Sequence, residues 1–275
     1  AYLAHELMNA NWQPCFLTEL ADALSDAKLE WVASSNLPEN FPTLTLSPEQ
    51  IALQQRFDDP LMRETIKDMC ITRTLRQDIF VRGARRIGRA VRDSILNDVS
   101  IGLNIPHDEL PAEAEMPAGT ASMNTEFYGP IVRMLADGPK RVGDLLRAVL
   151  KPGQRPNPAE LVGILVGLGF AEPASRPMAA PGDSAMRFNR VATQRLLRTE
   201  KINRPAAAAS YRMGTGVQIN LLEMLAVEQL RQTEPNADQL LQMIGPPPEE
   251  QEGLRTAIET VYRTRIPVLR AAGVF

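Results

Sequence analysis

The chain has 275 residues, of which 44% are hydrophobic and 23% charged, and its formal net charge is −3. This length allows two domains with a sizeable buried core, and the composition excludes wholesale disorder. The sequence has no apolar run near the roughly 18 residues of a membrane span and no secretory leader. Its two cysteines, Cys15 and Cys70, exclude a disulfide framework and are predicted to be small core residues. We therefore expect a cytoplasmic protein that is not associated with a membrane.

The charges lie in blocks of alternating sign. Residues 1–62 carry 2 basic and 9 acidic side chains, residues 63–92 carry 9 and 3, residues 93–126 carry none and 7, and residues 127–212 carry 14 and 6. Such blocks favour contacts between segments, or with a charged partner, over a uniform nucleic-acid surface.

The first third of the chain predicts short helices and strands. Residues 16–27 have the spacing of an amphipathic helix with Thr18 as N-cap, and residues 29–33 alternate as in a strand. Ser47 begins the next helix, with Pro48 at its first position and Gln50 at the capping-box position.

The segment from Arg63 to Arg86 is the most distinctive of the chain. Asp59-Pro60 opens a helix whose apolar face is predicted to hold Ile66, Met69, Cys70 and Leu75, and residues 77–81 are typical of a strand. The join between helix and strand carries four charged residues: Asp68, Arg73, Arg76 and Asp78. Two interpretations are open, a salt-bridged helix end and a functional surface.

Residues 95–105 predict one more strand, and residues 106–122, rich in Pro, Ala and Glu, predict a linker. We place one domain at 1–105 and a second at 123–275. The second follows the order of a winged helix. Helices are predicted at 126–135, 142–150 and 159–168, then a strand at 169–172, a flexible loop at 173–184 and a returning strand at 186–188. Further helices are predicted at 191–200, 218–232, 236–244 and 251–263. The fold class is therefore α+β: a mainly helical N-terminal domain with a few short strands, a winged-helix-like domain and C-terminal helices.

The sequence contains no catalytic or metal-binding constellation that we can identify. His5-Glu6 would need a histidine at position 9 for a zinc-protease motif, and Asn9 stands there. Gly214-Thr-Gly216 resembles part of a phosphate-binding loop, but no apolar strand is predicted before it, so we expect a flexible start to the following helix. We predict no catalytic residue, metal or cofactor site in this chain.

A winged helix suggests DNA binding, which is the alternative function. The third predicted helix, residues 159–168, carries Glu160 and has no Arg, Lys, Asn or Gln to contact bases or phosphates. Nucleic acid is therefore not the expected partner.

Three short motifs occur in an order that identifies a family resemblance. They are Tyr2-Leu-Ala-His-Glu6, Leu29-Glu-Trp-Val-Ala-Ser34 and the run from Lys67-Asp68 through Arg73 and Arg76 to Arg82. About the first 90 residues resemble the predicted methyltransferase regulatory domain, found C-terminal to class I S-adenosylmethionine-dependent methyltransferase domains in bacteria. The segment is similar to the middle part of rickettsial outer-membrane-protein lysine methyltransferases. Met69-Cys70-Ile71-Thr72 departs from the more aromatic family pattern.

The resemblance implies a non-catalytic, regulatory and substrate-recognition segment of a methyltransferase acting on protein. Since the chain begins at Ala1 without an initiator methionine, we expect the catalytic domain, with its S-adenosylmethionine, upstream. The expected partners are that domain and a protein substrate, with homodimerisation left open. The implied interface or substrate-entrance residues are His5, Glu6, Asp68, Arg73, Arg76, Asp78 and Arg82.

Overall fold

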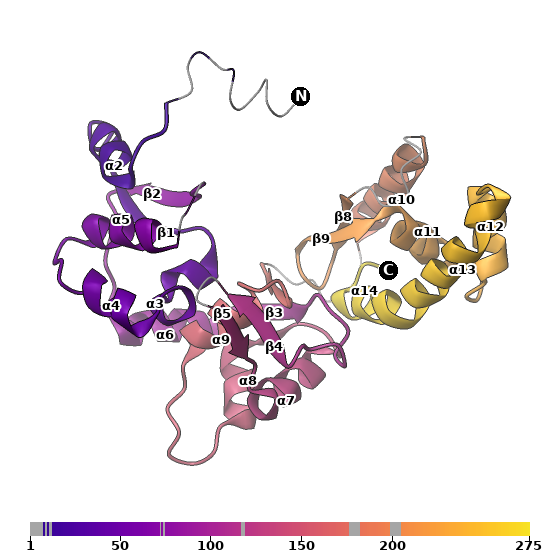
Figure 1. The fold of residues 1–275 in the computed structure, drawn as a ribbon. Coiled ribbons are helices and arrows are strands. Elements are labelled where there is room, and N and C mark those ends of the chain that lie inside the picture. Colours follow the sequence, from indigo (N-terminus) through magenta and orange to yellow (C-terminus); the bar gives the residue numbers. More distant parts are fainter. Residues whose placement is uncertain are drawn as a thin grey trace. The chain divides into compact units, whose positions relative to one another are not determined.

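The computed structural model describes residues 8, 10, 13–71, 73, 75–116, 119–175, 182–198 and 205–275. Over these residues the chain combines many helices with small sheets of two or three strands, so the predicted α+β class is confirmed (Figure 1). Contacts divide it into unit 1, Ala1–Ile87 with Glu113–Ala121, and unit 2, Gly88–Ala112 with Ser122–Phe275.

Unit 1 consists of short helices around a strand pair. Its main elements are α2 (Leu17–Ser25), β1 (Leu29–Ser34), the 3-10 helix η1 (Leu37–Asn40), α3 (Pro42–Thr45), α4 (Pro48–Gln54), α5 (Pro60–Cys70) and β2 (Asp78–Arg82). β1 and β2 pair antiparallel with Trp31 opposite Phe80, and α2 lies beside β1 and α5 (Figure 1). The predicted linker, residues 106–122, contains two strands that pair with each other, β4 (Glu113–Met116) and β5 (Gly119–Ser122). The domain limits inferred from the sequence stay a prediction.

Side-chain caps begin the central helices of unit 1. Ser47 and Gln50 form the predicted capping box, since each side chain accepts a hydrogen bond from the other residue's backbone N–H, at 3.4 and 2.9 Å. Asp59 accepts from the N–H of Leu61 at 3.1 Å ahead of α5, as predicted. The prediction for Thr18 is wrong. The helix begins before it, and the N–H of Phe16 is bound by the carboxylate of Glu19 instead.

The interior of unit 1 is unusually polar. Lys67 is 1% exposed, as buried as any apolar side chain of this unit, whereas Met69 and Leu75 are 61% and 78% exposed. The predicted apolar face of this segment is therefore wrong at Met69 and Leu75, because α5 turns its charged residues inward. Cys15, predicted to lie in the core, is exposed.

Unit 2 is larger and has an apolar core. Its elements are α6 (Arg89–Asp98), β3 (Ser100–Leu103), α7 (Thr125–Leu135), β6 (Lys140–Arg141), α8 (Val142–Val149), α9 (Pro158–Leu165), β7 (Ala171–Ala174), α10 (Asp183–Leu197), β8 (Pro205–Ser210), β9 (Thr215–Asn220), α11 (Leu221–Leu230), α12 (Ala237–Ile244), η2 (Pro248–Glu250), α13 (Gln251–Thr260), the π-helical segment η3 (Val261–Arg265) and α14 (Ile266–Ala272). β3 is the central strand of an antiparallel sheet with the order β6-β3-β7.

The winged-helix prediction is only partly met by these elements. α7, α8, α9 and β7 occur near their predicted positions, but residues 186–188, predicted as the returning strand, lie inside α10. Long-range contacts of Asn189 favour the helix here. Its side chain is buried against α10's neighbours, donating to the carbonyls of Ala209 and Val274 at 2.9 and 3.2 Å and accepting from the N–H of Ala209. The strand prediction for 186–188 is therefore wrong, and a winged helix is not shown.

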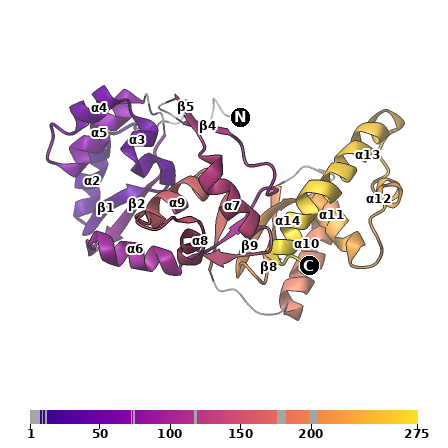
Figure 2. The same cartoon turned by 90° about the horizontal axis from the view of Figure 1, so that it is seen from below.

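The Gly214-Thr-Gly216 motif lies at a hairpin. Residues 205–210 form β8, residues 215–220 form β9, and Gly214 occupies the turn with φ +65°. The predicted helix start is therefore wrong here, and helix α11 begins only at Leu221. In both views α10 and α11 lie beside this hairpin, and α13 lies beside α12 (Figures 1 and 2).

The C-terminal run α13–η3–α14 is continuous and closes the apolar core. Its buried side chains Ile258, Ile266 and Leu269 join those of the hairpin and of α11. Within the described part of the chain, no helix combines the length and apolar character needed to cross a bilayer.

Candidate functional site

The charged join predicted from the sequence is an ion-pair cluster inside unit 1. Arg76 is its centre. Its Nε and Nη2 donate to the two carboxylate oxygens of Asp78, each at 2.7 Å, and its Nη1 donates to both oxygens of Asp68 at 2.6 Å. Nη2 also lies 3.3 Å from Oε2 of Glu64. One guanidinium group, 15% exposed, thus holds three carboxylates, using the planar fork of donors that only arginine offers.

Two further cations complete the cluster. Arg73, with a side chain 5% exposed, lies 3.0 Å from Oε2 of Glu39 and 3.4 Å from Oδ1 of Asp68. Nζ of Lys67 donates to the carbonyl of Glu39 at 2.9 Å and pairs with Glu64 at 2.5 Å. These contacts tie η1, which contributes Glu39, to α5 and to the segment before β2.

We call this set the ion-pair cluster: Glu39, Glu64, Lys67, Asp68, Arg73, Arg76 and Asp78. Four carboxylates and three cations leave it a formal charge of −1. Charges this buried need partners, because each would otherwise lose several kcal/mol of hydration without compensation.

The electrostatics of the cluster favour its charged form. Burial alone would lower the pKa of Arg76, but hydrogen bonds and charges from Asp78 and Asp68 outweigh it, so the pKa of Arg76 is raised. Burial alone would raise the pKa of Asp78, but hydrogen bonds from Arg76 and Trp31 and the charge of Arg73 hold this pKa below its usual value. The carboxylate of Asp78 is therefore stabilised as an ion rather than poised to take up a proton.

The structure brings four of the predicted site residues together and leaves the others apart. Asp68, Arg73, Arg76 and Asp78 are members of the ion-pair cluster, in contacts internal to unit 1. Arg82 is exposed at the far end of β2. His5 and Glu6 lie outside the described residues. The role of these seven residues in an interface or substrate entrance stays a prediction.

Three members of the cluster escaped the sequence analysis as site residues. Lys67 stands three positions after Glu64 on α5, a spacing that could have signalled their ion pair. Glu39 carries no such signal, because it lies 28 positions from Lys67 and meets it only through the fold.

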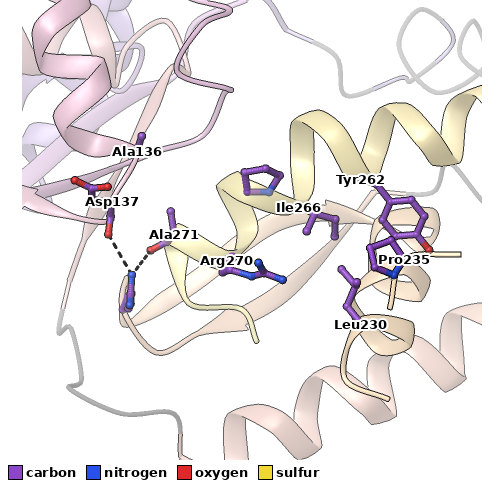
Figure 3. Close-up of a pocket in the computed structure, with 10 residues that line it drawn as sticks. Ala136, Asp137, Leu230, Pro235, Tyr262, Ile266, Arg270 and Ala271 are labelled. Atoms are coloured by element: carbon purple, nitrogen blue, oxygen red, sulfur yellow. Dashed lines mark hydrogen bonds between the residues drawn. The ribbon is translucent and has the colours of Figure 1, made fainter. Parts of the chain in front are cut away.

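Unit 2 contains a separate cavity of about 510 Å³, which we call the α14 groove (Figure 3). Its lining is Ala136, Asp137, Arg212, Leu230, Pro235, Tyr262, Ile266, Pro267, Arg270 and Ala271. Figure 3 shows Leu230, Pro235, Tyr262 and Ile266 at one side of the cavity and Arg270 between them and Ala271. Arg212 also belongs to the lining. Nothing in the sequence pattern indicated this groove, because its lining comes from seven separate stretches of the chain between Ala136 and Ala271.

The chain's first 82 residues match the model of a family described as predicted methyltransferase regulatory domain. This match confirms the resemblance inferred from the three motifs, and it contains the whole ion-pair cluster.

Solved structures of PKMT2 from Rickettsia typhi have a similar fold. One superposes with a TM-score of 0.53 over 97% of this chain at 12% identity, and a second, in complex with AdoHcy, with a TM-score of 0.55 over 100% at 13% identity. An uncharacterized protein of Synechocystis sp. is 28% identical over 227 residues, which is 82% of this chain. This chain spans 60% and 61% of the two PKMT2 chains and 44% of the Synechocystis protein.

Proposed function

We propose that this chain is the non-catalytic regulatory and substrate-recognition part of an S-adenosylmethionine-dependent methyltransferase that acts on protein in the bacterial cytoplasm. The observation that carries the proposal is the family match over residues 1–82. The likeness to PKMT2, one structure of which is a complex with AdoHcy, supports it at the level of the fold. In this proposal S-adenosylmethionine binds to a catalytic domain outside this chain, which spans 60% and 61% of the two PKMT2 chains.

The ion-pair cluster fits a scaffolding role within such a segment. Its carboxylates are held by cations, and the shift of the Asp78 pKa favours the ion, so none of these groups is arranged as a general base. The cluster instead fixes the join between α5 and β2, and with it the strand pair that unit 1 presents.

We propose the exposed face of β1 and β2 as the contact surface for the catalytic domain. Val32, Ile79 and Val81 are 47%, 44% and 39% exposed there, and Glu30, which pairs with Val81, is exposed as well. The predicted site residue Arg82 ends β2 on its other face, because side chains alternate along a strand. Exposed apolar side chains gathered on one face are typical of a protein-interaction surface. The ion-pair cluster would then support this interface indirectly, because it holds β2 in place.

The proposal is tested on the full-length protein, including the part encoded upstream of Ala1. Calorimetry is expected to show S-adenosylmethionine binding by the full-length protein and none by residues 1–275. Clear binding by residues 1–275 would contradict a non-catalytic role, and so would an upstream sequence without a strand and glycine-rich loop.

The predicted role of Arg82 at an interface is tested by charge reversal. Arg82→Glu is expected to lower methyl transfer to the protein acceptor without changing the melting temperature, and Arg155→Glu, at an exposed position in unit 2, serves as the matched control. Equal activity of both variants and the unmodified protein would contradict the assignment of Arg82 to an interface.

The alternative function, DNA binding, gains no support from α9, the third helix of the predicted winged helix, since α9 buries Leu161, Ile164 and Leu165.

A further inference from the structure

The α14 groove has two chemically different sides. Leu230, Pro235, Tyr262, Ile266 and Pro267 give it an apolar wall built from the end of α11, the loop before α12, η3 and α14. Figure 3 shows Leu230, Pro235, Tyr262 and Ile266 gathered along one side of the cavity, with Arg270 reaching in from α14. An apolar wall with a few polar groups at one end is the usual form of a site that fixes both the identity and the orientation of a ligand.

The two arginines of the groove form no ion pair with any acidic residue that the structure describes. Nη1 of Arg212 donates to the carbonyls of Asp137 and Ala271, each at 3.2 Å, and the guanidinium of Arg270 lies 5.2 Å from the centre of the Phe275 ring. Of the ion pairs among the described residues, none includes either arginine. The contact of Arg212 with Asp137 is to the backbone carbonyl and not to the carboxylate. The groove therefore presents positive charge that the described residues do not neutralise.

A local irregularity of the helix shapes the apolar wall. The run 251–272 changes from α to π geometry over Val261–Arg265, and π-helical turns occur frequently at functional sites. This turn carries Tyr262, whose hydroxyl donates to Oε1 of Gln229, so the ring is held at the groove by a contact to α11. Burial raises the pKa of Tyr262, which keeps this hydroxyl a donor at neutral pH.

We propose that the α14 groove binds an extended peptide segment in which an apolar side chain stands next to a carboxylate. The apolar side chain packs on Leu230, Tyr262 and Ile266, and the carboxylate pairs with Arg270. Tyrosine and arginine are the residues that dominate binding at protein–peptide contacts. A wall of prolines and aliphatic side chains has no donors to read a nucleotide base, which disfavours nucleic acid. That the peptide belongs to the methyl-acceptor protein rests on the proposed function; the binding itself does not.

The test is a display library of random twelve-residue peptides, selected on the immobilised full-length protein. The unmodified protein is expected to enrich peptides with an apolar residue next to Asp or Glu. Arg270→Glu is expected to replace that acidic preference by a preference for Lys or Arg. The matched control, Arg263→Glu, changes an exposed arginine of η3 outside the groove and is expected to retain the acidic preference.

Affinity for one enriched peptide, measured by fluorescence anisotropy, gives the second readout. Arg270→Glu and Leu230→Ala are each expected to weaken binding at least about tenfold, while Arg263→Glu leaves it unchanged. Circular dichroism melts confirm that each variant is folded. The proposal would be overturned if the unmodified protein enriched peptides without a preference for Asp or Glu. It would also be overturned if the Arg270→Glu variant showed the same acidic preference as the unmodified protein. A homodimer that Arg270→Glu dissociates would overturn it as well, since the groove would then be occupied by a second copy. If the full-length protein transfers methyl groups but enriches no such peptides, the groove proposal is wrong and the proposed function stands. If it enriches such peptides but has no methyltransferase activity, the groove proposal stands and the proposed function is wrong.

Discussion

Nε1 of Trp31 donates a hydrogen bond to Oδ1 of Asp78 at 2.8 Å, joining β1 to the ion-pair cluster. The two residues lie 47 positions apart, and Asp78 in turn holds Arg76 through two hydrogen bonds. One aspartate therefore connects the strand pair to the buried charges of α5. The stability of unit 1 should depend on this connection.

Replacing Trp31 by Phe removes the indole donor and retains an aromatic ring. A hydrogen bond to a charged group contributes about 1.5–3 kcal/mol, so we expect Trp31→Phe to lower the free energy of unfolding by an amount of this order. Urea unfolding followed by circular dichroism measures the change. The double variant with Asp78→Asn should show a coupling energy above about 0.5 kcal/mol. Strict additivity would mean that the two side chains do not interact in solution.

Arg76→Met leaves three carboxylates without their shared cation. Since removing one partner of a buried ion pair costs about 3–5 kcal/mol, this variant should be severely destabilised. Arg82→Met, at an exposed position of β2, should change stability by no more than about 0.5 kcal/mol. Thermal melts compare the melting temperatures of the two variants. Equal melting temperatures would argue against the cluster as a stabilising element.

Charge reversal at Arg76 separates the two interpretations of the join. In the full-length protein, Arg76→Glu should lower the melting temperature. If methyl transfer by the folded variant is unchanged, Arg76 orders the turn and takes no part in an interface.

Stability should fall at low pH through Asp78. Its pKa is lowered in the folded state, so its contribution is complete above the ordinary aspartate pKa of about 3.9 and is lost as the pH falls through the folded-state pKa. In melts between pH 6 and pH 2, the gap between the unmodified protein and Asp78→Asn should therefore narrow at the acid end. Asp108→Asn, at an exposed position, is the control. A gap that stays constant with pH would mean that the carboxylate is not stabilised as an ion.

Two glycines of the C-terminal helical run should respond oppositely to alanine. Gly273 has φ +79°, and a Cβ there would lie 2.7 Å from Cγ of Arg212 and 2.9 Å from Cε1 of Tyr211, so Gly273→Ala should destabilise by more than about 1 kcal/mol. Gly253, inside α13, has no atom within 4 Å of a Cβ position, so Gly253→Ala should stabilise by about 0.5 kcal/mol. Chemical unfolding of both variants measures the two signs. A stable Gly273→Ala variant would show that the turn after α14 can shift.

The starts of α4 and α5 were the most predictable part of the fold. Ser47 with Gln50, and Asp59, act within a few residues of themselves, so the sequence alone determines where these helices begin. Two segments were predicted wrongly because contacts with distant residues determine their structure. The alanines at 206–209, good helix formers, lie in β8 because β9 pairs with them, and residues 186–188 are helical because Asn189 is bound by β8 and the C-terminal segment. In both places long-range contacts outweigh local preference.

For the candidate sites, the sequence by itself indicated the resemblance of the N-terminal segment to a family, which the match over residues 1–82 confirms, and the four charged residues of the join. Charge density and short motifs are local properties, and both are visible along the chain. Only the tertiary structure decided that Arg76 holds three carboxylates, that Glu39 and Trp31 belong with them, and that Arg270 faces an apolar wall of Leu230 and Tyr262. Partners 28 or 47 positions apart leave no spacing pattern to detect, because buried charge and groove shape arise only when distant segments pack together.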